Sequence, residues 1–393
     1  MLRFALALLL AAIPLAAQLS DAAKKLHADA LVFDGHVHLI NRQFYEGGSM
    51  GDRHDNGQVD LPRMKEGGVD AFFMSMFTSE GYYVSRFETK QTLRLIDQAY
   101  RQLALNKDKV ELALNGADID RITASGKMAA VMDLEGSFDL DGDLAVLRML
   151  YKLGLRSAQL PAHNWTNNYA DSCCAEPKWS GLTEHGKDVI REMNRLGMVI
   201  NISHSSDETT AQAIATSEDP LVATHHGLRS VNDIPRLMTD ENLRALAAKG
   251  GVIGFHIGNS FHNPKYHAWR TKRSGRAFWD TSGVFDRYRD KTIEEVDKMA
   301  GKGYSAGPRA PDDVRFAVGD WIAVVEKAID LVGEDHVALG SDFDGGPTPP
   351  KPMETISDLP WLTQAMLDRG WSETRIKKFL GGNLLRVFRQ VTR

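Results

Sequence analysis

The chain has 393 residues, of which 43% are hydrophobic and 25% are charged, with 34 Gly, 14 Pro and 2 Cys. These proportions are those of an ordinary globular protein, and they exclude a disordered chain, a collagen-like repeat and a small disulfide-rich scaffold. The 47 Lys and Arg residues face 52 acidic ones, for a formal net charge of −5. Composition therefore gives no indication of a basic surface for nucleic acid.

The first 17 residues have the pattern of a secretory signal peptide. Arg3 precedes an apolar run over residues 4–13, and Ala16 and Ala17 supply small side chains at a cleavage point. The run is about half of the roughly 20 residues that a membrane-spanning helix needs, so we expect cleavage rather than a permanent anchor. An uncleaved anchor is the alternative. The mature chain is expected to be exported, to the periplasm or out of the cell, with no transmembrane span.

Eight short β-rich runs follow, separated by amphipathic helical stretches such as 90–105 and 184–196. The predicted strands are 30–39, 69–77, 128–135, 155–161, 198–204, 221–225, 251–257 and 336–342. Strands that alternate with helices predict βαβ units and a parallel sheet, and eight units favour a (β/α)₈ TIM-type barrel over a doubly wound open sheet. We expect a single catalytic domain over residues 25–393.

Three other stretches carry structural predictions. The longest irregular one, 258–312, would be an insert after the seventh strand, with His262 and His267 exposed to solvent. Residues 373–391 would form a final helix interrupted at Gly381 and Gly382. Cys173 and Cys174 are adjacent, and because a ring between neighbours needs unusual peptide geometry, we interpret them as loop residues near the rim of a pocket rather than as an ordinary disulfide.

Five of the predicted strands end in side chains that can bind a metal. His36 and His38 are two residues apart in one strand and therefore face the same side. The other strands contribute Asp133 and Glu135, His204, His225 or His226, and Asp342 or Asp344. The carboxyl ends of barrel strands hold the chemistry of this fold, and several buried imidazoles and carboxylates require a cation.

Imidazole and carboxylate together suit Zn²⁺ or a similar divalent ion. Six ligating groups exceed what one four-coordinate zinc uses, so two ions bridged by a shared carboxylate are expected. Such ions activate water and polarise a carbonyl, which predicts metal-assisted hydrolysis.

Several motifs resemble one known family. They are Asp34-Gly35-His36, Asp133-Leu134-Glu135-Gly136, Ile202-Ser203-His204 and the segments 181–204, 340–345 and 380–386. Together they resemble the membrane (renal) dipeptidase family of the metal-dependent amidohydrolase superfamily, from about Ala30 to the C-terminus. The resemblance implies a zinc-dependent dipeptidase with two zinc ions per chain, a hydroxide that bridges them as nucleophile, activity on dipeptides that can carry a C-terminal D-residue, and a possible homodimer.

The resemblance also implies a role for each site residue. His36 and His38 would bind the first ion, Glu135 would bridge both, and His204 and His225 would bind the second. Asp342 would orient the hydroxide and pass its proton to the leaving amine. His163 would stabilise the oxyanion, and Arg236 would bind the free carboxylate of the substrate.

Two positions require a choice between neighbouring residues, and a third departs from the family pattern. The spacing to Arg236 favours His225 over its neighbour His226, which would be a rim residue. Asp342 lies closer to its strand than Asp344, which would stabilise the glycine-rich turn. At His38 the family usually has Asp. His38 can simply replace the carboxylate as a metal ligand; the alternative hypothesis is that the loss of one negative charge weakens binding or alters metal preference at the first site.

Two other functions remain open at this point. The same machinery could act on another carboxylate-bearing amide, a lactam or a lactone. A non-hydrolytic, peptide-tailoring paralogue is the second alternative, which the complete set of metal-competent residues disfavours.

Overall fold

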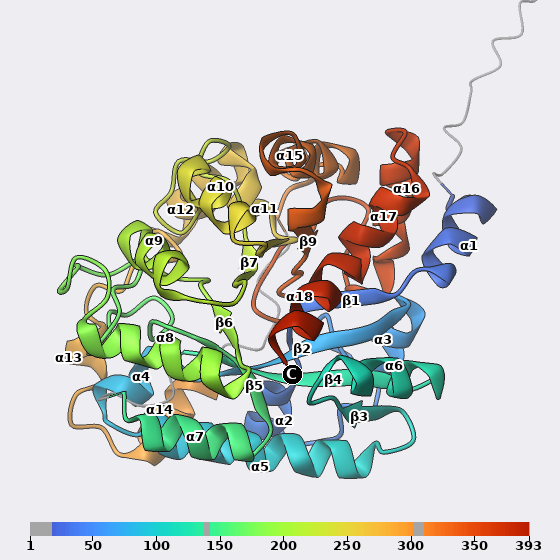
Figure 1. Ribbon diagram of the computed structural model, residues 1–393. Coiled ribbons are helices and arrows are strands. Elements are labelled where there is room, and N and C mark those ends of the chain that lie inside the picture. Colours follow the sequence, from blue (N-terminus) through green and yellow to red (C-terminus); the bar gives the residue numbers. More distant parts are fainter. Residues whose placement is uncertain (1–17, 137–141, 302–309, 393) are drawn as a thin grey trace, which may run out of the picture.

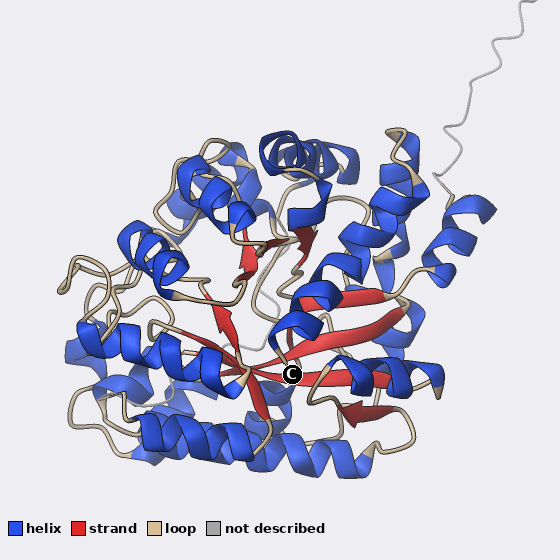
Figure 2. Cartoon of the chain, viewed as in Figure 1, coloured by secondary structure: helices blue, strands red, loops and turns tan. Residues whose placement is uncertain are grey.

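The computed structural model describes residues 18–136, 142–301 and 310–392. The predicted signal peptide lies outside these residues. Eight parallel strands form one nearly closed ring surrounded by helices, which confirms the predicted (β/α)₈ barrel (Figures 1 and 2). Their bounds are β1 (Val32–His38), β2 (Val69–Phe77), β4 (Met128–Glu135), β5 (Leu155–Gln159), β6 (Val199–Asn201), β7 (Val222–His226), β8 (Val252–Phe255) and β9 (Val337–Leu339).

The ring closes between its first strand and the residues that follow its last. Asp342 N donates to the carbonyl of His36 at 2.9 Å, and His38 N donates to the carbonyl of Phe343 at 3.0 Å. A ninth strand that the sequence analysis missed, β3 (Val110–Leu112), pairs with β4 outside the ring. Its three residues are too few to show an alternating pattern.

The helices that connect these strands begin and end at recognisable signals. In α8 (Glu184–Leu196), the Thr183 side chain accepts from Gly186 N at the start, and Gly197 ends the helix with φ of 75°. The other helices up to β8 are α1 (Asp21–Asp29), α2 (Ile40–Tyr45), α3 (Leu61–Glu66), α4 (Glu80–Val84), α5 (Glu88–Leu105), α6 (Gly116–Ala124), α7 (Leu144–Lys152), α9 (Asp207–Thr216) and α10 (Asp240–Ala248). Among the described residues, no helix is long and apolar enough to span a bilayer.

The insert after the seventh barrel strand is mostly helical rather than irregular. It holds α11 (Asn259–His262), α12 (Pro264–Ser274), α13 (Val284–Tyr288) and α14 (Ile293–Ala300). Figure 1 shows α13 and α14 next to α4, which follows the second strand of the ring. Tyr82 of α4 donates to Asp297 of α14 at 2.6 Å, and Arg94 of α5 pairs with the same carboxylate at 2.7 Å. The insert is therefore tied to the opposite side of the barrel.

The end of the chain closes the other end of the barrel. After α15 (Val318–Val332) and α16 (Pro360–Asp368), α17 (Glu373–Lys377) passes through a π-helical turn at Lys378–Gly382 into α18 (Asn383–Val391). This confirms the interrupted final helix. Leu384 and Phe388 of α18 pack in one buried cluster with Phe33, Phe73 and first residues of several barrel strands. This cluster thus fills the amino end of the barrel, which α18 covers (Figure 1).

Candidate metal centre

The predicted site residues meet at the carboxyl end of the barrel, and three of them have unusual backbone. His163, His204 and Asp342 adopt left-handed conformations, with φ of 59°, 65° and 62°. Residues other than glycine rarely adopt such conformations, which cost about 1–3 kcal/mol each and concentrate at functional sites. The strained backbone at these three residues therefore points to a functional role for the turns that hold them.

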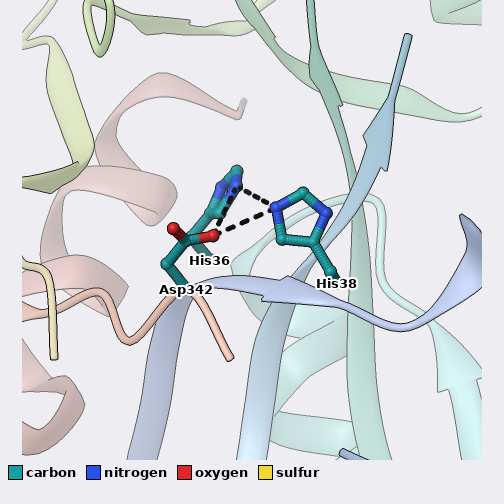
Figure 3. Close-up of side chains that lie close together, drawn as sticks. All are labelled: His36, His38 and Asp342. Atoms are coloured by element: carbon teal, nitrogen blue, oxygen red, sulfur yellow. Dashed lines mark hydrogen bonds and ion pairs between the residues drawn. The ribbon is translucent and has the colours of Figure 1, made fainter. Parts of the chain in front are cut away.

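A first donor group consists of His36, His38 and Asp342, which Figure 3 shows, together with the Oε2 atom of Glu135. His38 Nε2 lies 3.2 Å from His36 Nε2, 3.0 Å from Asp342 Oδ1 and 3.1 Å from Glu135 Oε2. His36 Nε2 lies 3.3 Å from the same Glu135 oxygen. Ligands of a tetrahedral zinc are separated by about 3.3 Å when each bond is about 2.0 Å, so these spacings suit one shared ion.

A second donor group consists of His204, His225 and the other oxygen of Glu135. Glu135 Oε1 lies 3.2 Å from His204 Nε2 and 3.5 Å from His225 Nε2, and the two nitrogens are 2.9 Å apart. Each oxygen of Glu135 therefore faces a different set of histidines. This is the arrangement that a carboxylate shared by two ions requires.

Contacts at the far side of the rings indicate which nitrogen faces the pocket. His36 Nδ1 faces a carboxylate oxygen of Asp133 at 3.3 Å, and His204 Nδ1 faces the amide oxygen of Asn164 at 2.8 Å. Both oxygens are acceptors, so each Nδ1 carries a proton and each Nε2 is the atom available to a metal. Nitrogen and carboxylate atoms this close together in a buried pocket require a cation between them, either a proton or a metal ion. The donor set is therefore that of a divalent metal site.

The charges in the pocket agree with this conclusion. Burial would lower the pKa of His36 and His38, but Glu135 and the neighbouring Asp carboxylates raise these pKa values to about 10 and about 9. At the second donor group, burial and the positive charges of His36 and Arg236 hold the pKa of His225 well below its usual value. The first group thus provides a strongly negative potential and the second a pair of neutral imidazoles, which together suit divalent cations.

Several residues that orient these ligands escaped the sequence analysis. They are Glu80, Asp133, Asn164 and Thr224. Glu80 Oε1 lies 2.5 Å from His163 Nδ1, and the Thr224 hydroxyl lies 3.0 Å from His225 Nδ1. Such partners fix the ring orientation of metal-binding histidines. Asp133 and Asn164 stand in quoted motifs, but only the fold shows that they face a ligand.

His256 is a further residue that the sequence analysis did not single out. Its Nδ1 accepts from Gly258 N at 2.7 Å, so its Nε2 carries the proton and donates to Asp342 Oδ2 at 2.9 Å. The ring stacks on Phe261 with a centroid distance of 3.7 Å and an interplanar angle of 3°. His256 follows the seventh strand, so its position at a strand end was the signal that could have revealed it.

Arg236 lies in the same pocket and is nearly inaccessible to solvent, with 1% of its surface exposed. Its Nη2 donates to the carbonyl of His225 at 3.0 Å, while Nε and Nη1 are buried without a partner in the part of the chain that the structure describes. Burial lowers its pKa to about 10, although Glu135 and Asp342 act in the other direction. Two unpaired donors on a buried guanidinium fit an anionic ligand. The pocket, of about 260 Å³, also contains His163.

The neighbours of the predicted ligands make other contacts. Asp344 lines the pocket but pairs with Arg42 at 3.2 Å and accepts from Gln58 N at 2.6 Å, so it ties its turn to the segment that contains Gln58. His226 is buried at 4% exposure rather than placed on a rim, and it is not part of either donor group.

The prediction that the insert histidines are exposed is wrong. His262 is fully buried, and its Nε2 lies 2.6 Å from the carbonyl of His256. His267 is half-buried against Trp279, with ring centroids 5.0 Å apart. Both were assigned to an irregular loop, whereas the helical insert packs against the barrel.

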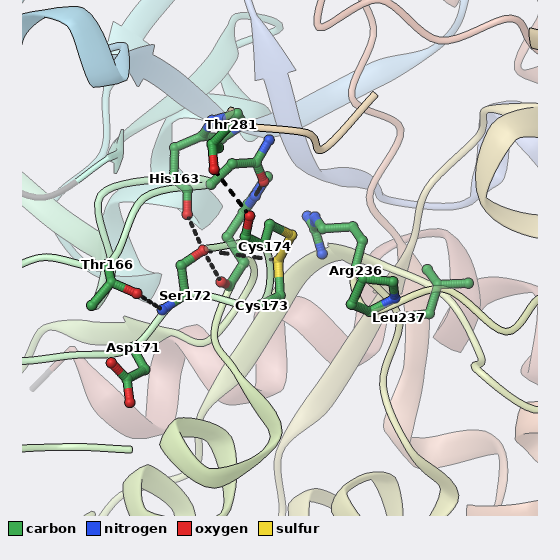
Figure 4. Close-up of a disulfide and its surroundings, with 12 residues drawn as sticks. His163, Thr166, Asp171, Ser172, Cys173, Cys174, Arg236, Leu237 and Thr281 are labelled. Atoms are coloured by element: carbon green, nitrogen blue, oxygen red, sulfur yellow. Dashed lines mark hydrogen bonds between the residues drawn. A yellow bond between two sulfur atoms is a disulfide. The ribbon is translucent and has the colours of Figure 1, made fainter. Parts of the chain in front are cut away.

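The prediction for the two cysteines is also wrong in one respect, because Cys173 and Cys174 form a disulfide (Figure 4). The surrounding chain holds the pair from both sides: Cys173 N donates to the carbonyl of His204 at 2.8 Å, and the Cys174 carbonyl accepts from the Thr281 hydroxyl at 3.2 Å. These tertiary contacts set a peptide geometry that sequence adjacency does not reveal. The pair lines a cavity between its own loop and the insert, as the expected rim position implies.

A barrel with histidines, carboxylates and a buried guanidinium at the carboxyl ends of its strands defines a metal-dependent hydrolase. The family is shown by sequence comparison: the chain belongs to the membrane dipeptidase family (peptidase family M19), which it matches over residues 20–393. It is therefore a metallopeptidase that hydrolyses peptide bonds.

Individual relatives agree with this assignment. Dipeptidase tcpJ of Claviceps purpurea is 30% identical over 343 residues, which cover 85% of this chain and 69% of the relative. Mouse dipeptidase 3 is 28% identical over 95% of this chain and 67% of its own length. The probable dipeptidase PvdM from Pseudomonas aeruginosa shares the fold, with a TM-score of 0.77 and 23% identity over 94% of this chain and 98% of that one.

Proposed function

We propose that this protein is a dipeptidase that holds two zinc ions and hydrolyses the peptide bond of dipeptides with a free C-terminal carboxylate, including dipeptides with a D-residue at that end. One observation carries the proposal: Glu135 divides its two oxygens between two sets of histidines, while the unpaired Arg236 guanidinium shares their pocket. When bound, the two ions would polarise the scissile carbonyl and activate a water molecule.

The residues of the chain supply binding and proton transfer. Arg236 would bind the substrate carboxylate through Nε and Nη1, which sets the length of substrate that fits, because a longer peptide has no carboxylate at that distance. Asp342 presents Oδ1 toward the first donor group and receives the His256 proton donor on Oδ2. It would accept a proton from the nucleophilic water and deliver it to the leaving amine.

His163 would stabilise the oxyanion that forms at the carbonyl. Burial would lower its pKa, but the adjacent Glu80 carboxylate raises it, so the ring carries its proton toward the pocket. Its Nε2 lies 3.8 Å from Glu135 Oε1, at the edge of the second donor group. A protonated donor fixed at this position favours the charge that develops in the transition state.

The test measures metal content and peptide hydrolysis on one purified sample. We expect about two zinc per chain and cleavage of leucyl dipeptides, L-Ala-L-Ala and L-Ala-D-Ala. A chelator should abolish this cleavage, and added zinc should restore it. Two metals without cleavage would favour a hydrolase for another carboxylate-bearing amide, lactam or lactone. One metal or none, and no cleavage after zinc is added, would contradict hydrolytic function.

We also propose that the protein is exported. The supporting observations are the signal-like pattern of residues 1–17 and the disulfide between Cys173 and Cys174, since disulfides persist mainly in oxidising compartments.

A further inference from the structure

A second arginine of the pocket has no function in the chemistry described above. Arg270 lies on α12 of the insert and lines the same cavity as Glu135, Arg236 and Asp342. It is half-buried, and burial lowers the pKa of its guanidinium. Among the described residues, no carboxylate forms an ion pair with it, although isolated charges of this kind are normally paired when they leave water.

The carboxylates of the pocket are engaged elsewhere. Glu135 and Asp342 face the histidines of the two donor groups, and Asp344 pairs with Arg42. The Arg270 guanidinium lies over an aromatic ring, with its Cζ atom 5.0 Å from the centroid of Phe278. A cation over a ring keeps its N–H donors free at the edge for a ligand.

The two arginines are connected by a pair of stacked rings. Phe278 stacks on Phe261 with centroids 5.4 Å apart, and the Arg236 guanidinium lies 5.2 Å from the centroid of Phe261. The series Arg270, Phe278, Phe261, Arg236 thus forms one wall of the pocket. Arg236 is at its buried end and Arg270 at its more exposed end.

This arrangement indicates which part of a substrate Arg270 meets. In the proposed function, on which this inference rests, Arg236 binds the C-terminal carboxylate, so the wall beside Arg236 faces the C-terminal residue. The N-terminal residue lies across the scissile bond, beyond the metal-binding side chains. An anionic group on the C-terminal residue is therefore the ligand within reach of Arg270, and in ordinary dipeptides that group is a side-chain carboxylate.

We propose that Arg270 makes the enzyme selective for dipeptides whose C-terminal residue is acidic, by binding the side-chain carboxylate of Asp or Glu while Arg236 binds the backbone carboxylate. The guanidinium fork suits a carboxylate in bidentate geometry, and the partly desolvated position strengthens the pair. Arg270 then acts on binding rather than on the chemical step.

The experiment compares shape-matched substrates with the metal-loaded enzyme. We expect kcat/KM for Ala-Glu to exceed that for Ala-Gln by about tenfold or more, mainly through KM, because the ion pair exists in the ground state and the transition state alike. Glu-Ala against Gln-Ala, which moves the charge to the N-terminal residue, should show no such preference.

Variants then assign the preference to Arg270. R270Q should reduce the Ala-Glu to Ala-Gln ratio to about one, and R270K should retain part of it. R273Q is the matched control, because Arg273 lies on the same helix, contacts Trp269 and does not line the pocket. A ratio is insensitive to a general loss of activity, and R270K covers the case in which R270Q does not fold.

The outcomes separate this inference from the proposed function. Cleavage of Ala-Gln with no preference for Ala-Glu, a preference at the N-terminal position, or a preference that survives in R270Q would overturn the role of Arg270 and leave the dipeptidase intact. Failure to cleave any of the four dipeptides would contradict both.

Discussion

At the scale of single residues, His38 is the position at which this chain departs from the pattern of the family it resembles. Its Nε2 contacts both carboxylates of the first donor group, so it occupies the place of a ligand. A neutral imidazole in place of a carboxylate leaves one negative charge fewer opposite the first ion. We therefore expect a weaker first site than a carboxylate would provide.

The substitution H38D tests this consequence. We expect the variant to retain the first metal about tenfold more tightly, while the second ion, held by His204 and His225, serves as the internal reference. Metal retained during dialysis against increasing chelator measures the difference. Wild-type protein that keeps two tightly bound zinc ions under the same conditions would contradict the prediction.

His256 provides a second prediction at this scale. We expect H256F to keep the stacking on Phe261 but to lose the proton donor to Asp342, with kcat reduced about 10- to 100-fold and KM nearly unchanged. H256Q, whose amide can donate to Asp342, should recover part of the rate. H336Q is the control, since His336 lies at the opposite end of β9. Equal losses in H256F and H256Q would show that His256 has only a structural role.

At the scale of elements, α1 docks onto the barrel through a buried histidine. His27 Nε2 donates to the carbonyl of Gly67 at 2.8 Å, and its Nδ1 then accepts from the hydroxyl of Thr363 at 2.7 Å. Burial lowers the pKa of His27, and the hydrogen bond to Gly67 offsets this only in part. The folded protein therefore holds this ring neutral.

This arrangement predicts a contribution to acid sensitivity. Because the folded pKa is below the unfolded value of about 6.5, the unfolded chain takes up a proton first as pH falls below 6.5. Stability should then decrease by up to about 1.4 kcal/mol per pH unit from this group, until the folded pKa is reached, and should not change above pH 7. H27Q should show a shallower slope in urea unfolding between pH 5 and 6.5. Identical slopes would contradict the assignment.

The strands and the site were predictable to different degrees. Short apolar runs such as residues 128–132 in β4 are visible in the local sequence, and the helix at 184–196 has clear caps at Thr183 and Gly197. The three-residue β3 has no such run. The insert helices and the Cys173–Cys174 disulfide depend on contacts with distant segments, such as that of Thr281 with the Cys174 carbonyl.

The same distinction holds within the site. His36, Glu135 and Asp342 were predictable because they end strands, where barrels place their chemistry. Glu80 was not, because its importance lies in an orientation toward His163, a histidine from another segment. His256 was missed although it lies near the end of the predicted strand 251–257.

At the scale of the whole molecule, the two donor groups couple metal binding to stability. Two carboxylates and four imidazoles of these groups lie buried at one end of the barrel, so removal of bound ions should leave repulsion among them. We expect a chelator to lower Tm by about 10 °C, reversibly on addition of zinc. Calorimetry with and without chelator measures this. An unchanged Tm would contradict a role for metal in the folded barrel.

Export gives the last prediction. We expect the mature protein to begin at Gln18, after removal of the first 17 residues. N-terminal sequencing and intact mass of protein recovered from outside the cytoplasm would determine the cleavage point. A chain that retains Met1 and fractionates with membranes would instead indicate an anchor.

The position of α18 has a consequence for biosynthesis. Leu384 and Phe388 seal a barrel end whose first strand starts at Val32, so the core cannot be completed until nearly the whole polypeptide has left the ribosome. Contacts between such distant segments form slowly and late. A translocation channel that admits only unfolded chains would therefore receive this protein before its barrel has formed.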